Sequence, residues 1–319
     1  MITLSDIRSA RARLDGVTAR TKLVRFPLCA EDPRQLLLKP ENQQPIGAFK
    51  LRGAYNKIAS LPEAERQRGV ISYSSGNHAQ GVAYAARALK TKSVIVMPNN
   101  APQIKREATA KLGAEIVLVG PGSDERKEKA EQLSAEHGYL IVPPYNDQHI
   151  IAGQGTIGLE ILEDFPDVEA IYSPVGGGGL ISGVAAAIKL TNPKIKVIGV
   201  EPELAADAQA SLRQGGIVQL PADQVSRTVA DGLRTQSIGL INFAHIHAYV
   251  DDIITVSEDE IRQAMKYLSA NPATVAEPSG AVATAGFIFH SMECPRTDRN
   301  VAIISGGNIE PEMLAELRK

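Results

Sequence analysis

The sequence predicts an α/β protein with two domains, each containing an open, mostly parallel sheet flanked by helices. Short apolar segments alternate with helical segments between residues 70 and 142, as is typical of strand–helix–strand units. The chain has 319 residues, 44% of them hydrophobic, which is enough for two packed units. Three polar, glycine-containing loops, 74–78, 176–179 and 305–308, each follow a predicted strand. Because ligands bind at the carboxyl ends of strands in such sheets, these loops should line one cleft.

Local patterns give the elements in chain order. Short apolar runs predict strands at 36–39, 70–73, 93–97, 115–119, 140–142, 170–172, 196–200 and 301–304. The segments between them predict helices at 50–59, 79–89, 103–112, 124–137, 151–165 and 180–190. A further helix should begin after Ser257, because Ser257 and Glu260 have the spacing of a capping box and apolar residues follow at helical intervals. Pro143 and Pro144 should end the strand before them and return the chain to the first domain.

Composition excludes several classes of protein. A formal net charge of −2 provides no general attraction to nucleic acid or to an anionic membrane surface. The alanine-rich runs are interrupted before they reach the length of a membrane span, and the polar N-terminal segment does not resemble a signal peptide. The two cysteines, Cys29 and Cys294, exclude a disulfide framework and fit a reducing cytoplasm. The six histidines form no metal-binding cluster in the sequence, so a zinc site is not expected.

Residues 176–179 are four consecutive glycines between a predicted buried strand and an alanine-rich helix. Backbone N–H groups in such a loop can converge on a small anion at the helix N-terminus, where the helix dipole also favours negative charge. We therefore predict a phosphate-binding loop. No Gly-Lys-Ser/Thr follows, which excludes a triphosphate-binding P-loop, and Ile181 and Ser182 break the spacing of a dinucleotide site. Two alternatives are a loop that only packs helix on strand, and a dinucleotide-like site with Glu201 as the ribose-binding acid.

Four motifs occur together and in order: Pro45-Ile-Gly-Ala-Phe-Lys50-Leu-Arg-Gly-Ala54, Ser74-Ser-Gly-Asn-His78, the glycines at 176–179, and Ser305-Gly-Gly-Asn308. This set resembles the pyridoxal-phosphate enzymes of the serine/threonine dehydratase and serine racemase family, which have the tryptophan-synthase-β type of fold. The similarity covers nearly the whole chain. It implies a large domain formed by 1–68 and 147–319, a small inserted domain formed by 69–146, and pyridoxal 5′-phosphate bound in the cleft between them.

The resemblance also implies a role for each matching residue. Lys50 is similar to the Schiff-base lysine, and Ser75 to the acid/base group on the opposite face of the cofactor. Phe49 would pack beside the ring, Asn77 would bind the ring hydroxyl, and Ser305 the ring nitrogen. The phosphate would be bound by Gly176, Gly177, Gly178 and Gly179. The substrate would be bound by Ser74, Ser75, Gly76, Asn77 and His78. A divalent cation (Mg²⁺ or Ca²⁺) would be bound by Glu201, the carbonyl of Ala205, and Asp207.

Some of these residues have a structural alternative. His78 fits a core or helix-start histidine better than a catalyst. Glu201 and Asp207 could be exposed acids after a strand. A lysine on a helix face is usually solvated, so Lys50 is predicted to be catalytic only because the other motifs accompany it.

The chemistry implied is β-elimination from a small β-hydroxy amino acid, giving a 2-keto acid and ammonia. Partial burial would lower the pKa of Lys50 and give it the neutral amine needed to attach the cofactor and to remove the Cα proton. A hydroxyl such as Ser305 does not keep the ring nitrogen protonated, which should disfavour transamination and favour loss of a β-leaving group. L-Serine, L-threonine, 3-hydroxyaspartate and a bulkier β-hydroxy amino acid all remain candidate substrates, because Ala48, Pro45-Ile46 and the segment 145–147 (Tyr-Asn-Asp) depart from the commoner family residues.

Two other functions stay open. The first is an amino-acid racemase of the serine or aspartate type with elimination as a side reaction. The second is a non-catalytic cofactor-binding protein, which intact Lys50 and Ser75 disfavour. The lack of an appended regulatory module disfavours a feedback-controlled biosynthetic threonine enzyme. We also expect a cytoplasmic homo-oligomer, a dimer, that acts on an amino acid and binds neither nucleic acid nor membrane.

Overall fold

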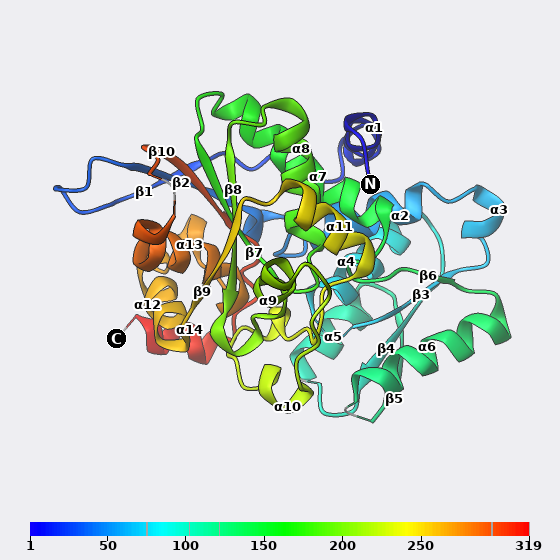
Figure 1. Ribbon diagram of the computed structural model, residues 1–319. Coiled ribbons are helices and arrows are strands. Elements are labelled where there is room, and N and C mark those ends of the chain that lie inside the picture. Colours follow the sequence, from blue (N-terminus) through cyan, green and yellow to red (C-terminus); the bar gives the residue numbers. More distant parts are fainter. Residues whose placement is uncertain (75, 102, 121, 295, 319) are drawn as a thin grey trace.

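The larger of two sheets organises most of the chain (Figure 1). The computed structural model describes residues 1–74, 76–101, 103–120, 122–294 and 296–318. The larger sheet has the strand order β1-β2-β10-β7-β8-β9, and only β1 and β2 pair antiparallel. Its strands are β1 (Val24–Phe26), β2 (Gln35–Pro40), β7 (Ala170–Pro174), β8 (Lys196–Pro202), β9 (Asp252–Val256) and β10 (Arg299–Ile304). Because β2 pairs with β10, the two ends of the chain meet in one sheet.

The second sheet has four parallel strands in the order β5-β4-β3-β6. They are β3 (Val70–Tyr73), β4 (Ser93–Pro98), β5 (Glu115–Val119) and β6 (Leu140–Ile141). The predicted α/β class with two mostly parallel sheets is therefore confirmed. The domain boundaries, 69–146 within 1–68 and 147–319, stay a prediction, because strand positions alone do not define where a domain ends.

The α-helices connect these strands and cover both sheets. They are α1 (Leu4–Leu14), α2 (Lys50–Ala59), α3 (Glu63–Arg66), α4 (Asn77–Ala88), α5 (Gln103–Lys111), α6 (Ser123–His137), α7 (Gln148–Asp164), α8 (Gly179–Thr191), α9 (Asp207–Gln214), α10 (Ala222–Val225), α11 (Leu240–Tyr249), α12 (Glu258–Leu268), α13 (Pro278–His290) and α14 (Pro311–Leu317). Short 3₁₀ turns are η1 (Glu41–Gln43), η2 (Glu203–Ala205), η3 (Asp231–Leu233), η4 (Pro272–Thr274) and η5 (Ser291–Glu293). Within the described residues, no helix is long and apolar enough to cross a membrane.

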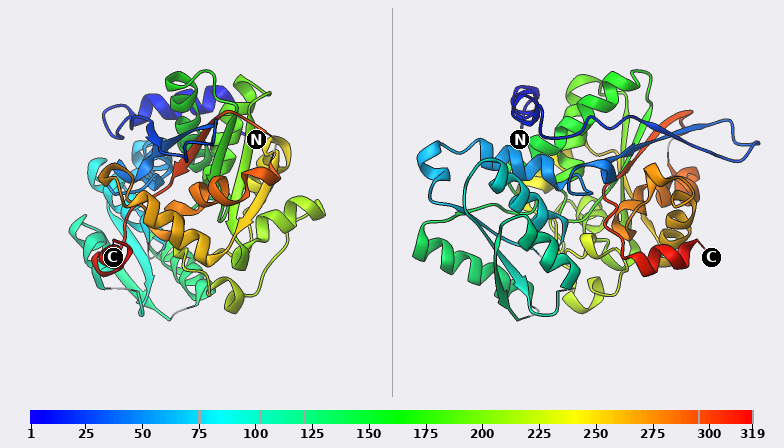
Figure 2. Two further views of the ribbon diagram at one scale, coloured as in Figure 1. Left: turned by 90° about the vertical axis from the view of Figure 1, so that its left-hand side faces the viewer. Right: turned by 180° about the vertical axis from the view of Figure 1, so that it is seen from behind.

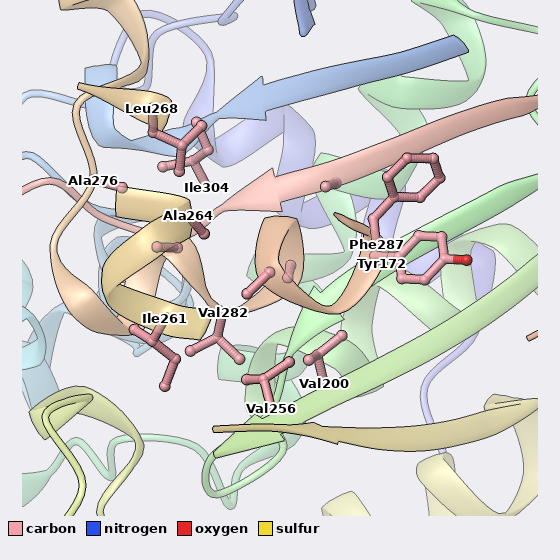
Figure 3. Close-up of a cluster of buried hydrophobic side chains, with 14 of the residues drawn as sticks. Tyr172, Val200, Val256, Ile261, Ala264, Leu268, Ala276, Val282, Phe287 and Ile304 are labelled. Carbon is pink, nitrogen blue, oxygen red and sulfur yellow. The ribbon is translucent and has the colours of Figure 1, made fainter. Parts of the chain in front are cut away.

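One face of the larger sheet is covered by α12 and α13, which bury an apolar cluster against the strands (Figure 3). The rings of Tyr172 in β7 and Phe287 in α13 meet edge to face, with centroids 5.3 Å apart. Ile261 and Leu268 of α12 belong to the same cluster, which confirms the apolar face expected after Ser257. The capping box between Ser257 and Glu260 is also present. Burial of this apolar area is the main stabilising contribution on this side of the sheet.

The opposite face of the larger sheet packs against α7, α8 and α11, and α2 lies between α7 and the α4 helix of the smaller sheet. The α2–α7 contact is close because Gly153 has no side chain: a Cβ there would lie 2.6 Å from the carbonyl oxygen of Arg52. α2 therefore bridges the two sheet systems. The tip of the β1–β2 hairpin, by contrast, projects from the rest of the chain (Figure 2), although β2 itself pairs with β10.

The structure also contains strands and α-helices that the sequence patterns did not predict, namely β1, β9, α1, α3, α9, α10, α11, α13 and α14. The start of α7 was predicted three residues late. It begins at Gln148 because the Asp147 side chain accepts hydrogen bonds from the backbone N–H groups of His149 and Ile150. Cys29 and Cys294 are both free, as expected, and only Cys29 is exposed.

Candidate active site

The segment before α2 is joined to the loop after β10. The backbone N–H of Phe49 donates to the carbonyl of Ser305 at 3.0 Å, and Ala48 forms an isolated bridge with Gly306. The N–H of Gly307 donates in turn to the carbonyl of Gly47 at 2.9 Å. This pairing holds the first residue of α2, Lys50, next to the carboxyl end of β10. Two of the predicted motifs are therefore brought together.

Lys50 is partly exposed, but its amine points into the interior. The Nζ atom donates to the carbonyl oxygen of Pro144 at 2.8 Å. It also lies 5.3 Å from the centroid of the Phe49 ring. Burial lowers the pKa of Lys50 to about 8. A substantial fraction of the amine is therefore neutral near pH 8, as a nucleophile or a base requires.

The glycine loop lies between β7 and α8 and is buried along its whole length. Gly178 has φ +89°, a left-handed conformation that favours glycine, and it is the N-cap of α8. A Cβ on Gly177 would lie 2.3 Å from the ring of Tyr145. The missing side chain at Gly177 thus makes room for the Tyr145 ring, while the backbone N–H groups at the N-terminus of α8 can bind an anionic group such as a phosphate. Residues 176–179 thus fit the phosphate part of the cofactor.

Asn77, Asn308 and Glu277 form a polar chain at the start of α4. Asn77 Nδ2 donates to Glu277 Oε1 at 2.5 Å, and Asn308 Nδ2 donates to Asn77 Oδ1 at 2.7 Å. The Ser305 hydroxyl donates to the carbonyl of Ser279 at 3.3 Å. The side chains predicted for the ring hydroxyl and the ring nitrogen therefore both lie where α13 meets the end of β10.

Sequence reasoning missed Glu277. It lies 200 positions from Asn77 and outside every motif. The one signal available was an acid in the otherwise small and apolar run from 273 to 283, directly before Pro278. Side chains of this kind are rarely buried unless they are paired.

The loop after β3 places Ser74 and His78 in different surroundings. The backbone N–H of Gly76 donates to the Ser74 hydroxyl at 3.3 Å. His78 is buried, and its Nε2 lies 3.0 Å from the carbonyl oxygen of Val142. Burial and the nearby Lys50 charge lower the pKa of His78 to about 3, so the ring is neutral. This environment fits the core histidine that the sequence left open. Ser75, the expected acid/base residue, lies outside the described residues.

Glu201, in the last part of β8, and Asp207, the first residue of α9, form a buried acidic pair. Glu201 accepts hydrogen bonds from the N–H groups of Ala208, at 3.0 Å, and Gln209, at 2.8 Å. Neither oxygen of the buried Asp207 has a well-formed hydrogen bond among the described residues, although the backbone N–H groups of Asp207 itself and Ile238 act to lower its pKa. Burial, with the Asp207 charge, raises the pKa of Glu201, and burial raises the pKa of Asp207 to about 7.

Glu201 and Asp207 are both buried, so the alternative prediction that they are exposed acids after a strand is wrong. Ala205, whose carbonyl was the third expected ligand, is also buried. No cluster of three or more His, Cys, Asp or Glu side chains occurs in the described part of the chain. Each Glu201 oxygen accepts one backbone N–H and keeps a further lone pair. With Asp207 and a backbone carbonyl, this carboxylate nevertheless fits a hard, oxygen-liganded cation.

The fold and these loops define an enzyme of the pyridoxal-phosphate class. A sequence model of the family described as pyridoxal-phosphate dependent enzyme matches residues 14–306, and the chain belongs to this family. The chain is 45% identical to an L-threonine ammonia-lyase of Thermotoga maritima, over 98% of this chain and 77% of that protein. It is 42% identical to the L-threo-3-hydroxyaspartate ammonia-lyase of Saccharomyces cerevisiae, over 99% and 96%. The structure of maize serine racemase superposes with a TM-score of 0.94 at 35% identity, covering 98% of this chain and 96% of that one.

Proposed function

We propose that this protein binds pyridoxal 5′-phosphate through Lys50 and catalyses β-elimination from a small β-hydroxy amino acid. The observation that carries the proposal is the buried Lys50 amine, with its pKa lowered to about 8, beside the Ser305 loop. The similarity to proteins named threonine and hydroxyaspartate ammonia-lyase supports the same reaction. Glycines 176–179 would hold the phosphate, Phe49 would pack beside the ring, and Asn77 and Ser305 would bind its polar atoms.

The cofactor supplies an electron sink for the electron pair left at Cα when its proton is removed. Lys50, as a neutral amine, would take that proton. The Cβ–O bond then breaks, hydroxide leaves, and a Cα–Cβ double bond forms. Water converts the released enamine to a 2-keto acid and ammonia. The N-terminus of α4 and the loop of residues 74–78 before it would hold the substrate carboxylate.

Ser305 supports elimination rather than transamination. It presents a neutral hydroxyl, not a carboxylate, where the resemblance places the ring nitrogen. This hydroxyl donates to the Ser279 carbonyl at 3.3 Å; turned instead towards the ring, it would donate to an unprotonated nitrogen, and it carries no charge to hold a proton there. A weaker electron sink favours prompt loss of the leaving group.

The test is keto-acid release by the cofactor-loaded protein with L-serine, L-threonine and L-threo-3-hydroxyaspartate. At least one should give a 2-keto acid and an equal amount of ammonia, and Lys50→Ala should give neither. A loaded wild-type protein that releases no keto acid from any of them would contradict the proposal. The panel also identifies the preferred substrate, which the departures at Ala48 and Tyr145 leave open.

A racemase is the second candidate, because the maize serine racemase structure is so similar. Chiral chromatography of the recovered substrate separates the two. A dehydratase leaves the remaining substrate in its original configuration, whereas a racemase produces the opposite enantiomer at a rate comparable with elimination.

Three further expectations belong to the same proposal. A divalent cation, Mg²⁺ or Ca²⁺, would bind Glu201, Asp207 and the carbonyl of Ala205, where two buried carboxylates lie together and no cationic side chain of the described residues acts on their pKa values. The protein would be a homodimer, which light scattering after size-exclusion chromatography would measure. It would act in the cytoplasm, in keeping with its two free cysteines.

A further inference from the structure

Glu277 is a buried carboxylate that binds a residue of the cofactor site instead of its own helix. It directly precedes α13, and its side chain makes no capping hydrogen bond to that helix. Its residue exposure is 4%, and its Oε1 atom accepts from Asn77 Nδ2 at 2.5 Å. A carboxylate placed in the interior without a partner of opposite charge is destabilising. A role at the site would explain why it lies there.

The backbone around Glu277 directs its side chain towards Asn77. The N–H of Glu277 donates to the carbonyl of Gly306 at 3.1 Å, so the start of α13 lies against the end of β10. A Cβ on Gly306 would lie 2.0 Å from Glu277 Oε1 and 3.0 Å from Asn77 Nδ2. Gly306 therefore leaves the space in which the two side chains meet.

The carbonyl of Ile46 fixes the donor and acceptor directions of the hydrogen bonds among Asn308, Asn77 and Glu277. The carbonyl oxygen of Ile46 can only accept, and it accepts from Asn308 Nδ2 at 2.9 Å. The same Asn308 amide nitrogen donates to Asn77 Oδ1 at 2.7 Å. The Nδ2 group of Asn77 must then face Glu277, which has to supply an acceptor. A reversed Asn77 amide would place its oxygen against the Glu277 oxygen and lose the bond from Asn308.

The hydrogen bonds among Asn77, Glu277 and Asn308 also connect the two sheet systems. Asn77 begins α4, which packs on the smaller sheet, while Glu277 precedes α13, which packs on the larger sheet, and Asn308 follows β10 of that sheet. The Nδ2 group of Asn77 has two hydrogens and gives one to Glu277. The second is left for the cleft, where Asn77 is expected to meet the cofactor ring.

The charged groups around Glu277 are Asp231 in η3 and Lys105 in α5, which pair with each other at 2.5 Å. Burial and the Asp231 charge raise the pKa of Glu277 to about 8, whereas the hydrogen bond from Asn77 and the Lys105 charge act in the opposite direction. The positive end of the α13 dipole also favours the ionised form. Glu277 thus changes its charge near neutral pH while it keeps an oxygen that accepts from Asn77.

We infer that Glu277 is a positioning residue of the cofactor site: it fixes the amide of Asn77 towards the cofactor ring, and its charge influences the protonation of that ring through Asn77. The inference rests on the proposed function, in which Asn77 binds the ring hydroxyl. No substrate contact by Glu277 is required.

The experiment compares cofactor binding and absorbance in wild type, Glu277→Ala and Glu277→Gln. Glu310→Gln is the matched control, because Glu310 likewise precedes a helix that begins with proline. Binding of pyridoxal 5′-phosphate to the cofactor-free protein is followed by fluorescence, and the absorbance of the loaded protein is recorded from pH 6 to 9.5. Circular dichroism checks that each variant is folded.

Glu277→Ala leaves the buried Nδ2 group of Asn77 without its acceptor and should weaken cofactor binding by about tenfold, the scale of an unsatisfied buried donor. Glu277→Gln keeps an acceptor and should bind within about threefold of wild type, a difference well below that of such a bond. The wild-type absorbance should change with pH in a step that Glu277→Gln lacks and that Asp231→Asn moves to lower pH. Glu310→Gln should behave as wild type in both measurements.

Wild-type binding and an unchanged pH profile in Glu277→Ala overturn the inference. If Glu277→Ala does not fold, the profile of Glu277→Gln decides instead: a wild-type pH step in that variant means that the Glu277 charge does not reach the cofactor. A wild-type protein that binds no cofactor contradicts the proposed function itself, and is thereby distinguished from a failure of the role given to Glu277.

Discussion

Lys50 Nζ donates to the carbonyl oxygen of Pro144 at 2.8 Å, and this bond connects the first residue of α2 to the segment that leaves the smaller sheet. A carbonyl accepts from a charged and from a neutral amine, and although it binds the charged form more strongly, it carries no full negative charge. It therefore holds Lys50 in place without the carboxylate that would keep the amine protonated. Burial then determines the pKa of Lys50, which falls to about 8.

The first prediction concerns how Lys50 reacts with the cofactor. The rate at which cofactor-free protein takes up pyridoxal 5′-phosphate should rise with pH through about 8, because only the neutral amine is a nucleophile. After borohydride reduction, peptide mass mapping should place the pyridoxyl group on Lys50. Lys266→Ala, on the surface of α12, should react as wild type, and Lys50→Ala should not react. A label on another lysine would show that the assignment is wrong.

The second prediction concerns the cation proposed at Glu201 and Asp207. A chelator should lower the melting temperature, because an ion that binds only the folded state contributes about 2.7 kcal/mol at a hundredfold excess over its Kd. The double variant Glu201→Ala, Asp207→Ala should be insensitive both to chelator and to added Mg²⁺ or Ca²⁺. Chelator saturated with Mg²⁺ beforehand is the control and should have no effect. Equal responses of the wild type and the double variant would show that no cation binds at Glu201 and Asp207.

The sequence predicted those parts of the site that lie in short motifs. Lys50 was placed at the start of its helix, and glycines 176–179 between a strand and a helix, because turn residues and apolar runs carry that information locally. α13 was missed for a physical reason. Its residues from Pro278 to Phe287 are all buried, so the helix has no polar face and no helical periodicity to detect.

Contacts between distant parts of the chain could not be predicted from the sequence either. Glu277 meets Asn77 only because β10 and α13 come together beside α4. Local patterns do not record such long-range packing. α1 is a different case, since Thr3 and Asp6 form a capping box that the sequence does show. Its many arginines concealed the short apolar face formed by Ile7, Ala10 and Leu14.

A third prediction concerns Ser75 and separates elimination from racemisation. The resemblance places Ser75 on the face of the cofactor opposite Lys50, where formation of the D-enantiomer needs a proton donor. A positioned acid or base typically contributes about 10²–10⁴-fold. Ser75→Ala should reduce racemisation, and elimination from D-serine, by roughly that factor, while elimination from the L-substrate falls much less. Keto-acid formation from each enantiomer, with chiral chromatography, is the measurement. Equal losses for both would indicate a shared role such as carboxylate binding.

A fourth prediction concerns the buried ion pairs that Arg52, two residues after Lys50, forms with Glu41 and Glu160. Arg52 donates to Glu41 at 2.7 and 2.8 Å and to Glu160 at 2.6 and 2.9 Å. Arg52→Ala leaves Glu41 buried without its cationic partner and should lower the free energy of unfolding by about 3–5 kcal/mol. The control is Arg262→Ala on α12, whose partner Asp259 is exposed, with an expected change within about 0.5 kcal/mol. Urea unfolding measures both, and similar values would mean that the network adds little stability.

The last prediction concerns pH and the contact between α12 and α13. His290 lies between two carboxylates, with Nδ1 2.7 Å from Glu293 and Nε2 3.0 Å from Glu260. A neutral imidazole has one N–H, so only the protonated ring can donate to both. Partial burial opposes the charged form, but the bonds to Glu293 and Glu260 outweigh it and raise the pKa of His290.

Because the folded-state pKa of His290 is above its unfolded value of about 6.5, the stabilisation is fully present below that pH. It is lost as pH rises through the folded-state pKa. Urea unfolding of wild type and His290→Ala at pH 6 and pH 8.5 should therefore show a larger difference in stability at pH 6. Glu293→Gln removes one carboxylate and should reduce that pH-dependent difference. If His290→Ala destabilises the protein equally at both pH values, the ring contributes through packing and not through its charge.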